Sequence, residues 1–215
     1  MYNLIEYIKS LKESDYYERV NLHIHTTCSD GKLNPKAVIQ AAIEQNLETI
    51  AITDHNSVEA YSQIENYDND KLTLINGVEF DCWHGMDLLH IIGYGIDLNN
   101  QKIKRLCASN HIFTRYDLVR FFNNRKAKDV IKAIKEAGGL AILAHPACCW
   151  SFNLKKMIIK LKTFGLDGIE VYYPYVGHRG FIKFRSLNDI KKIAQELDLI
   201  ITGGADTHGG NLRSR

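Results

Sequence analysis

The sequence lacks any apolar run near the roughly 18 residues that a membrane-spanning helix needs. Its five cysteines are an odd number without a CxxC pair, which favours reduced thiols in the cytoplasm over a disulfide framework. No internal repeat and no linker rich in proline, glycine or serine divides the 215 residues, which include only three prolines. The formal net charge of +2 is too small to indicate a nucleic-acid-binding protein by itself. These absences predict one cytoplasmic domain with no membrane segment and no evident obligate protein partner.

Short apolar runs alternate with helical patterns along the chain. Strands are expected at 20–24, 49–53, 72–80, 88–94, 140–144, 168–172 and 199–202. The helices between them are expected to span about 10–12 residues each, which predicts an α/β fold with a largely parallel sheet. Near-continuous apolar strands such as 140–144 suit a sheet that is covered on both faces. The pattern alone leaves an open doubly wound sheet and a closed barrel as alternatives.

Most of the nine histidines stand at or just after the end of an expected strand. His23 and His25 lie two residues apart at the end of the first strand, so both side chains point to the same face and can hold one metal ion. Almost all of the further candidates lie at or just after the end of an expected strand, and Glu79 and His90 lie within strands: Asp30, Asp54, His55, Glu79, His90, His145, Asp206 and His208. A lone histidine is usually an ordinary surface or core residue, but this ordered set at the catalytic edge of a parallel sheet predicts a metal site.

Seven runs stand in order between residues 21 and 209: NLHIHTTCSDG, AITDHNSV, GVEF, LLHIIGYGI, AILAHPA, DGIEVYYP and GGADTHG. Together they resemble the polymerase-and-histidinol-phosphatase (PHP) family of metal-dependent phosphoesterases. The resemblance implies a distorted (β/α)7 barrel that forms a single domain over residues 1–215, with a short, mostly helical insertion or lid at about 101–136. It is greatest to the stand-alone members that hydrolyse nucleotide phosphates, which include phosphatases of 3′,5′-bisphosphonucleotides and enzymes that trim RNA from its 5′ end.

The resemblance also assigns nine side chains to three divalent metal ions, with Glu79 as a bridge between the first two. The three groups are His23, His25, Glu79 and Asp206; Glu79, His90 and His145; and Asp30, His55 and His208. Such nitrogen and oxygen donors suit Mn, Fe or Zn and do not discriminate sharply among them. The implied reaction is direct in-line attack by a metal-bound hydroxide on a phosphate monoester, without a covalent phosphoenzyme. Asp54, beside His55, is expected to orient a neighbouring imidazole instead of binding metal.

Residues 101–136 contain ten Lys or Arg and three Asp or Glu. Arg115, Arg120 and Arg125 are the candidates for binding a substrate phosphate, because a guanidinium can contact two phosphate oxygens at once. The alternative is a solvated helix face, which is the usual reason for a run of charge. Four aromatic side chains of this segment are interpreted as core beneath a lid, with base stacking as the alternative: Phe113, Tyr116, Phe121 and Phe122.

The loop YYPYVGHRG follows the strand that contains Glu170 and therefore lies on the predicted catalytic side. His178 and Arg179 in this loop are expected to hold a phosphate or to protonate the leaving group. Glu170 itself is expected to support the site without ligating metal. The adjacent thiols of Cys148 and Cys149 are interpreted as buried and inert.

The expected substrate is a small phosphate ester or a short oligonucleotide. Two alternatives stay open: a phosphatase of another small metabolite, such as histidinol phosphate, and a non-catalytic metal-binding module. A carbon–nitrogen hydrolase is less well supported, because it would usually need a single metal ion or a carbamylated lysine bridge. No lysine stands at the end of an expected strand to form that bridge.

Overall fold

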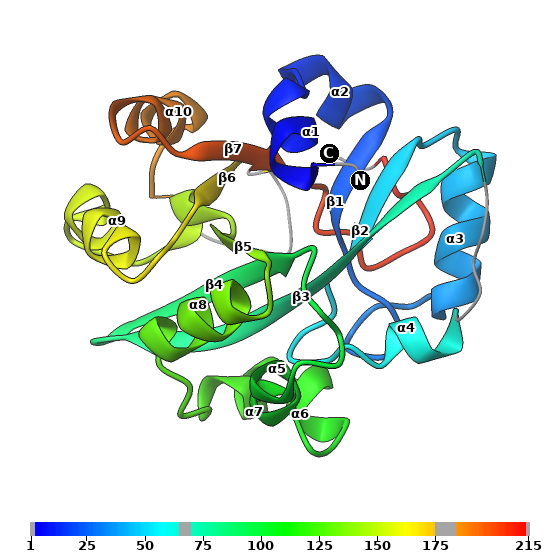
Figure 1. Cartoon of the computed structure of the whole chain (residues 1–215), viewed down its shortest axis with the longest axis horizontal. Coiled ribbons are helices and arrows are strands. Elements are labelled where there is room, and N and C mark those ends of the chain that lie inside the picture. Colours follow the sequence, from blue (N-terminus) through cyan, green and yellow to red (C-terminus); the bar gives the residue numbers. More distant parts are fainter. Residues whose placement is uncertain (1–2, 65–69, 175–183, 214–215) are drawn as a thin grey trace.

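The fold is built on one seven-stranded sheet whose strands are arranged in sequence order (Figure 1). The computed structural model describes residues 3–64, 70–174 and 184–213. The strands are β1 (Val20–Ile24), β2 (Thr49–Ile52), β3 (Thr73–His84), β4 (Asp87–Tyr94), β5 (Leu140–Leu143), β6 (Gly168–Tyr172) and β7 (Ile200–Gly203). Neighbouring strands are parallel except β4, which pairs antiparallel with both β3 and β5. The expected α/β fold with a mostly parallel sheet is therefore confirmed, and the direction of β4 is the part that the pattern did not predict.

The two outer strands are brought together by the segment that follows β7. The backbone N–H of His25 donates to the carbonyl of Thr207 at 2.9 Å, and the N–H of Thr207 donates to the carbonyl of His23 at 3.1 Å. This pairing covers the free edge of β1 and curls the sheet, as Figure 1 shows where β7 approaches β1. The closure agrees with the distorted barrel that the family resemblance implies.

Helices cover the outside of the curled sheet (Figure 1). They are α1 (Leu4–Ser10), α2 (Glu13–Glu18), α3 (Pro35–Glu44), α4 (Ala60–Gln63), α8 (Ala127–Glu136), α9 (Leu154–Lys162) and α10 (Leu187–Glu196). Side-chain caps fix where several of them begin: Asn34 accepts the N–H of Ala37 at 2.9 Å, and Ser186 forms a capping box with Asp189. Among the described helices, none combines the length and the apolar character that a bilayer crossing requires.

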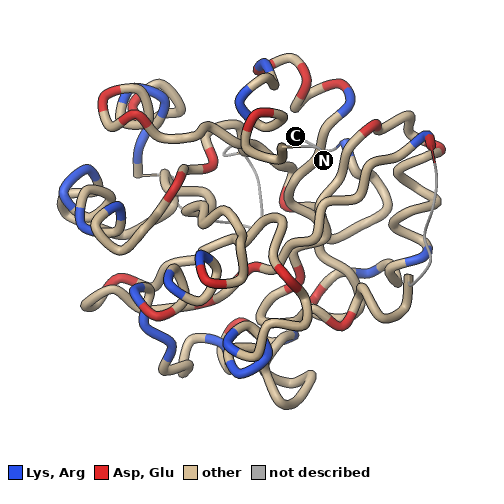
Figure 2. The backbone as a smooth tube through the Cα atoms, viewed as in Figure 1, with Lys and Arg blue, Asp and Glu red and all other residues tan. Residues whose placement is uncertain are grey.

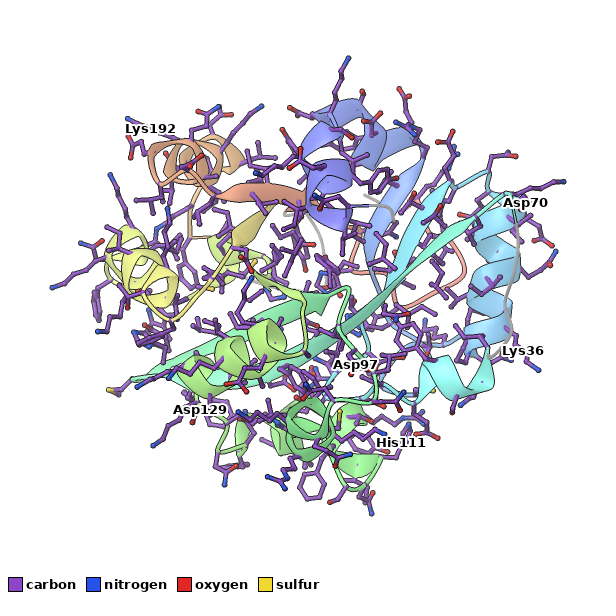
Figure 3. The ribbon with its side chains drawn as sticks, in the orientation of Figure 1. Lys36, Asp70, Asp97, His111, Asp129 and Lys192 are labelled. Carbon is purple, nitrogen blue, oxygen red and sulfur yellow. The ribbon has the colours of Figure 1, made fainter. Side chains whose placement is uncertain are left out.

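Between β4 and α8 the chain forms three short helices, α5 (Gln101–Leu106), α6 (Ile112–Arg115) and α7 (Asp117–Phe121). They lie together beside α8 in Figure 1, and His111, which precedes α6, is labelled in Figure 3. α8 buries Val130, Ile131 and Ile134 in the main hydrophobic core, to which the short helices contribute Ile103 of α5. The insertion at 101–136 stays a prediction, and within that range α8 packs as one of the helices that cover the sheet.

The aromatic side chains of this segment do not form a core, so that part of the sequence interpretation is wrong. Four of them are between 47% and 77% exposed: Phe113, Tyr116, Phe121 and Phe122. The buried residues of α6 and α7 are instead the polar Thr114 and Arg120. Figure 2 shows that lysine and arginine residues mark α8, α9 and the short helices next to them. The segment is therefore basic and aromatic on its surface, with a buried arginine inside.

Candidate metal centre

β1 delivers two histidines to the interior of the site. His23 and His25 alternate with buried apolar residues along the strand, so both imidazoles lie on the same face of the sheet. His23 Nε2 lies 3.3 Å from Glu79 Oε2, and His25 Nε2 lies 3.0 Å from Asp206 Oδ1. The two-residue spacing thus brings both rings to carboxylates that come from β3 and from the segment after β7.

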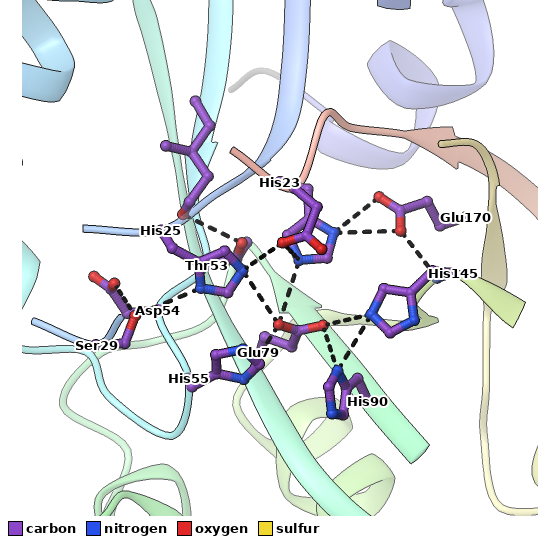
Figure 4. Close-up of polar contacts among 12 residues, drawn as sticks. His23, His25, Ser29, Thr53, Asp54, His55, Glu79, His90, His145 and Glu170 are labelled. Atoms are coloured by element: carbon purple, nitrogen blue, oxygen red, sulfur yellow. Dashed lines mark hydrogen bonds and ion pairs between the residues drawn. The ribbon is translucent and has the colours of Figure 1, made fainter. Parts of the chain in front are cut away.

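Glu79 on β3 lies in the middle of the site, with imidazoles around both of its carboxylate oxygens (Figure 4). Its Oε2 is 3.3–3.4 Å from ring nitrogens of His23, His25 and His55. Its Oε1 is 3.3 Å from ring nitrogens of His90 and His145. Burial alone would raise the pKa of Glu79, but the neighbouring imidazoles outweigh burial and hold this pKa well below its usual value. A carboxylate that stays charged at this position is suited to bridge two cations.

A second group of donor atoms surrounds Asp30, in the loop after β1. Asp30 Oδ1 lies 3.0 Å from His208 Nε2 and 3.6 Å from His25 Nδ1, while Asp30 Oδ2 lies 4.0 Å from His55 Nε2. One ligand atom from each of these four residues lies within 4.8 Å of the others. Two further groups meet the same criterion: His23, His25 and Asp206; and His55, Glu79 and His90. The three groups overlap, so they form one centre.

The donor atoms of this centre fit divalent metal ions. Five of them are buried without a hydrogen-bond partner: His23 Nε2, His25 Nε2, His55 Nδ1, Glu79 Oε2 and His208 Nε2. Buried polar atoms in proteins normally have partners, and a cation bound among these nitrogens and oxygens would supply one to several atoms at once. The structure brings all nine predicted ligands together, including His145 through its contact with Glu79.

Two side chains at the end of β6 orient members of this centre. Glu170 Oε1 lies 3.0 Å from His23 Nδ1, and Glu170 Oε2 accepts the backbone N–H of His145 at 2.9 Å. Tyr173 donates its hydroxyl to Asp206 Oδ2 at 2.8 Å. A carboxylate on Nδ1 fixes the imidazole tautomer that presents Nε2 to a metal ion. Glu170 thus supports the site without being one of its nine candidate ligands, and Tyr173 is a supporting residue that the sequence analysis missed.

Asp54 has contacts that differ from the expected ones. Its carboxylate accepts the N–H of Thr26 at 2.7 Å, the hydroxyl of Thr26 at 2.6 Å and the hydroxyl of Ser29 at 2.6 Å. It reaches an imidazole only through Ser29, whose hydroxyl lies 3.5 Å from His25 Nδ1. Asp54 therefore holds the loop between His25 and Asp30, and does not hold a ring directly.

Asp81 is a buried carboxylate of the centre that the sequence analysis missed. It follows Glu79 by two residues on β3, so the two side chains share one face of the strand. Asp81 Oδ1 lies 3.1 Å from His90 Nε2 and 3.4 Å from His55 Nδ1, and Asn56 donates a hydrogen bond to Asp81 Oδ2. The two-residue periodicity of side chains along β3 could have identified Asp81, as the same periodicity identified His23 and His25 as neighbours.

Arg120 reaches the metal centre, whereas the other two candidate arginines lie elsewhere in the insertion. Its side chain is only 5% exposed, and its guanidinium donates to Asp30 Oδ2 at 3.1 Å and lies 3.5 Å from Asp81 Oδ1. Arg125 donates to a backbone carbonyl at 2.7 Å and lines a cleft of about 860 Å³ within the insertion. Arg115 is exposed. The insertion is thus joined to the centre through a buried guanidinium.

The remaining candidates are the loop after β6 and the paired cysteines. His178 and Arg179 lie outside the described residues, so their role stays a prediction. Cys149 is buried, and burial raises the pKa of its thiol to about 12, as expected for an inert cysteine. Cys148 is half-buried.

The fold and the converging donors define an α/β domain with a candidate multinuclear metal centre at one end of its sheet. A model of the PHP domain family matches residues 21–201. Because this match spans most of the chain, the protein belongs to the PHP family.

Individual relatives are similar over shorter stretches. The 5′-3′ exoribonuclease Rnm of Escherichia coli (strain K12) is 35% identical over 94 residues, which cover 42% of this chain and 32% of that protein. A 3′,5′-nucleoside bisphosphate phosphatase of Chromobacterium violaceum is 33% identical over 79 residues, covering 36% of this chain and 28% of that protein. The chain thus matches about a third of the length of these curated relatives.

Solved structures share the fold. A Bifidobacterium adolescentis protein assigned to the metal-dependent phosphoesterases superposes with a TM-score of 0.68 at 21% sequence identity. The superposition covers 90% of this chain and 88% of that chain. The likeness therefore extends over nearly the whole architecture.

Proposed function

We propose that this protein is a metal-dependent phosphoesterase that hydrolyses phosphate monoesters of nucleotides, either in a 3′,5′-bisphosphonucleotide or at the 5′ end of a short RNA. The observation that carries this proposal is the convergence of six histidines and three carboxylates, with His145 included through its contact with Glu79; five buried atoms of this set lack a hydrogen-bond partner. Membership of the PHP family supports it, as does the activity named for the phosphatase relative. The activity named for the exoribonuclease relative is cleavage of RNA, which supports RNA as the substrate.

The nine side chains would hold three divalent ions, which we propose are Mn, Fe or Zn. The groups are His23, His25, Glu79 and Asp206; Glu79, His90 and His145; and Asp30, His55 and His208. When bound, such ions neutralise charge on phosphoryl oxygens and activate water as a nucleophile near neutral pH. The protein contributes the placement, since Glu170 orients His23 and Asp54 holds the loop that carries Asp30.

Arg120 is the residue that we propose to contact the substrate phosphate. Its guanidinium lies at the edge of the centre beside the carboxylates of Asp30, Asp81 and Asp117. Its Nη atoms already donate within the protein, and its buried Nε, which has no hydrogen-bond partner, is the donor that we propose for a phosphoryl oxygen. His178 and Arg179 remain candidates for holding the phosphate or protonating the leaving group. Arg115 and Arg125 remain candidates for contacts further from the reacting bond.

Phosphate release with Mn²⁺ supplied tests the proposal on three substrates: a 3′,5′-bisphosphonucleotide, a 5′-phosphorylated RNA trimer and histidinol phosphate. We expect turnover of at least one nucleotide substrate and its loss in His25→Ala. His111→Gln is the matched control, because His111 is an exposed histidine outside the nine. A glutamine there can still donate to the carbonyl of Thr27, as the His111 ring does at 2.9 Å.

The outcomes separate the alternatives. Turnover of histidinol phosphate alone would favour a phosphatase of another small metabolite. Bound metal with neither phosphate release from any of the three substrates nor shortening of the RNA trimer would favour a non-catalytic module and would contradict the proposal.

A further inference from the structure

A cleft of about 330 Å³ lies directly beside the metal centre, and His90 and His145 form part of its wall. The wall also contains three aromatic rings: Trp83, Phe121 and Trp150. The rings of Trp83 and Phe121 meet edge to face, with centroids 5.1 Å apart. The cleft thus joins two side chains of the reaction centre to rings that can stack a flat group.

A second cleft of about 590 Å³ continues from the first, because the two share Met86, Asp87 and Trp150. Phe152 bounds it further, together with Lys156 and Lys160 of α9. These two lysines lie four residues apart and so share one face of the helix; Figure 2 shows lysines along α9. We call the joined surface the aromatic cleft, defined by Trp83, Phe121, Trp150, Phe152, Lys156 and Lys160.

The aromatic cleft exposes rings that do not contribute to the hydrophobic core. Trp150 is 80% exposed and Phe152 is 105% exposed. Exposed apolar surface of this kind next to a site of chemistry is typical of a binding site, and each volume lies within the about 300–1,000 Å³ usual for ligand sites. Both tryptophans of the chain line the cleft.

We infer that the aromatic cleft binds the nucleotides that follow the reacting 5′ phosphate of a single-stranded oligonucleotide. The first base lies among Trp83, Phe121 and Trp150, and the chain continues past Trp150 towards α9. This inference rests on the proposed function and deepens it, because it selects an oligonucleotide over a bisphosphonucleotide as the better substrate. Aromatic rings followed by lysines are the arrangement that binds single strands without reading their sequence.

The charges along the cleft agree with this direction. Lys156 and Lys160 provide positive charge where backbone phosphates would pass, about one helix turn apart. Asp87 is the carboxylate shared by the two clefts. An ionised carboxylate only accepts hydrogen bonds, so it suits a ribose hydroxyl or a base amine and disfavours a phosphate. The phosphates are therefore directed to the lysine side.

Intrinsic fluorescence tests binding without turnover, since both tryptophans line the cleft. The metal-loaded protein is titrated with an RNA trimer that carries a 5′ hydroxyl and so has no terminal monoester to hydrolyse. We expect saturable quenching of tryptophan emission. In Lys156→Ala the Kd is expected to rise several-fold. Lys156 is chosen over Lys160 because Lys160 Nζ also lies 5.3 Å from the ring of Phe164.

Kinetics test the same inference during turnover. The wild-type kcat/KM is expected to increase from a 5′-phosphorylated mononucleotide to the dinucleotide and the trimer. Trp150→Ala should lower kcat/KM for the trimer about tenfold, the effect of losing one stacked base, so the ratio of trimer to mononucleotide falls. Tyr17→Ala on α2 and Lys36→Ala on α3 are matched controls that should keep the ratio; Lys36 lies on the opposite side of the molecule from α9 (Figure 3).

The outcomes distinguish the two proposals. An active wild-type enzyme whose trimer preference is unchanged by Trp150→Ala and Lys156→Ala would overturn the inference and leave the proposed function standing. A wild-type enzyme inactive on all nucleotide substrates would contradict the proposed function, while the fluorescence titration would still decide about the cleft. A dimer in sedimentation that Trp150→Ala dissociates would assign the cleft to a second copy of the chain and overturn the inference.

Discussion

The metal centre and the aromatic cleft lie side by side, but their side chains are held in opposite ways. In the centre, strand ends and buried carboxylates fix each imidazole, as Glu170 fixes His23. In the cleft, Trp150 and Phe152 extend into solvent. Chemistry on a phosphoester depends on donor atoms placed before the substrate arrives, whereas stacking of a flexible strand tolerates mobile rings. This contrast agrees with our proposal that catalysis belongs to the buried region and substrate choice to the exposed one.

The largest expected effect comes from Glu79→Gln, which removes the charge between five imidazoles. Phosphate release from the preferred nucleotide substrate should fall by roughly 10³-fold or more, the upper range for losing one preorganised electrostatic group. Steady-state kinetics with Mn²⁺ measures the loss. The exposed Glu48→Gln is the control; equal activity of the Glu79→Gln and Glu48→Gln variants would contradict a central role for Glu79.

Arg120→Ala tests how the two regions are joined, because Arg120 contacts the centre while its neighbour Phe121 lines the cleft. Removing the guanidinium leaves Asp30 and Asp81 buried without their cation, which should cost about 3 kcal/mol of unfolding free energy in metal-free protein. Added Mn²⁺ should restore part of that loss. Urea unfolding in EDTA and in Mn²⁺ measures the loss of unfolding free energy without and with metal. An equal loss under both conditions would contradict an interaction between Arg120 and the metal centre.

Glu170→Gln should have a smaller effect, because Glu170 orients a ligand and is not one. We expect a 10–100-fold reduction in metal affinity, with activity recovered at high Mn²⁺ concentration. Metal titration followed by phosphate release measures this. Activity that no metal concentration restores would show that Glu170 contributes more than the orientation of His23.

Cys149→Ala should have the smallest effect, and only at high pH. Burial raises the pKa of Cys149 to about 12, whereas a thiol in the unfolded chain ionises near pH 8.5. Between these values the unfolded state binds fewer protons, so stability is lost as pH rises from about 9 towards 12. Urea unfolding at pH 8 and pH 10 should show a decline in stability about 2 kcal/mol smaller in Cys149→Ala. The half-buried Cys148→Ala is the control, and identical slopes for the two variants would contradict a buried, protonated Cys149.

Much of the centre could be predicted from the sequence because most of its residues stand at or just after strand ends; Glu79 and His90 are the exceptions, since they lie within β3 and the antiparallel β4. The period of two in β1 places His23 and His25 together, and parallel strands bring their carboxyl ends to one edge. Asp81 follows from the same rule but was overlooked, since it belongs to no motif of its own.

Other features depend on contacts that no local pattern contains. Arg120 meets Asp30 across 90 residues of sequence. The antiparallel direction of β4, by contrast, follows from a local feature, the tight β3–β4 turn at Gly85 and Met86, which the alternation of strands and helices does not reveal. The exposed aromatics were misjudged because apolar residues are usually buried. Of the four, Phe121 lines the cleft beside His90, whereas Phe113 and Phe122 line the cleft within the insertion.

The number of metal ions per chain tests the central claim most directly. The metal content of Mn²⁺-loaded, desalted protein is measured by mass spectrometry for the wild type and for Glu79→Gln. Our account predicts about three ions per wild-type chain and a clear reduction in the variant, because Glu79 belongs to two of the three ligand groups. One ion or none in the wild type, or three ions retained by Glu79→Gln, would contradict it.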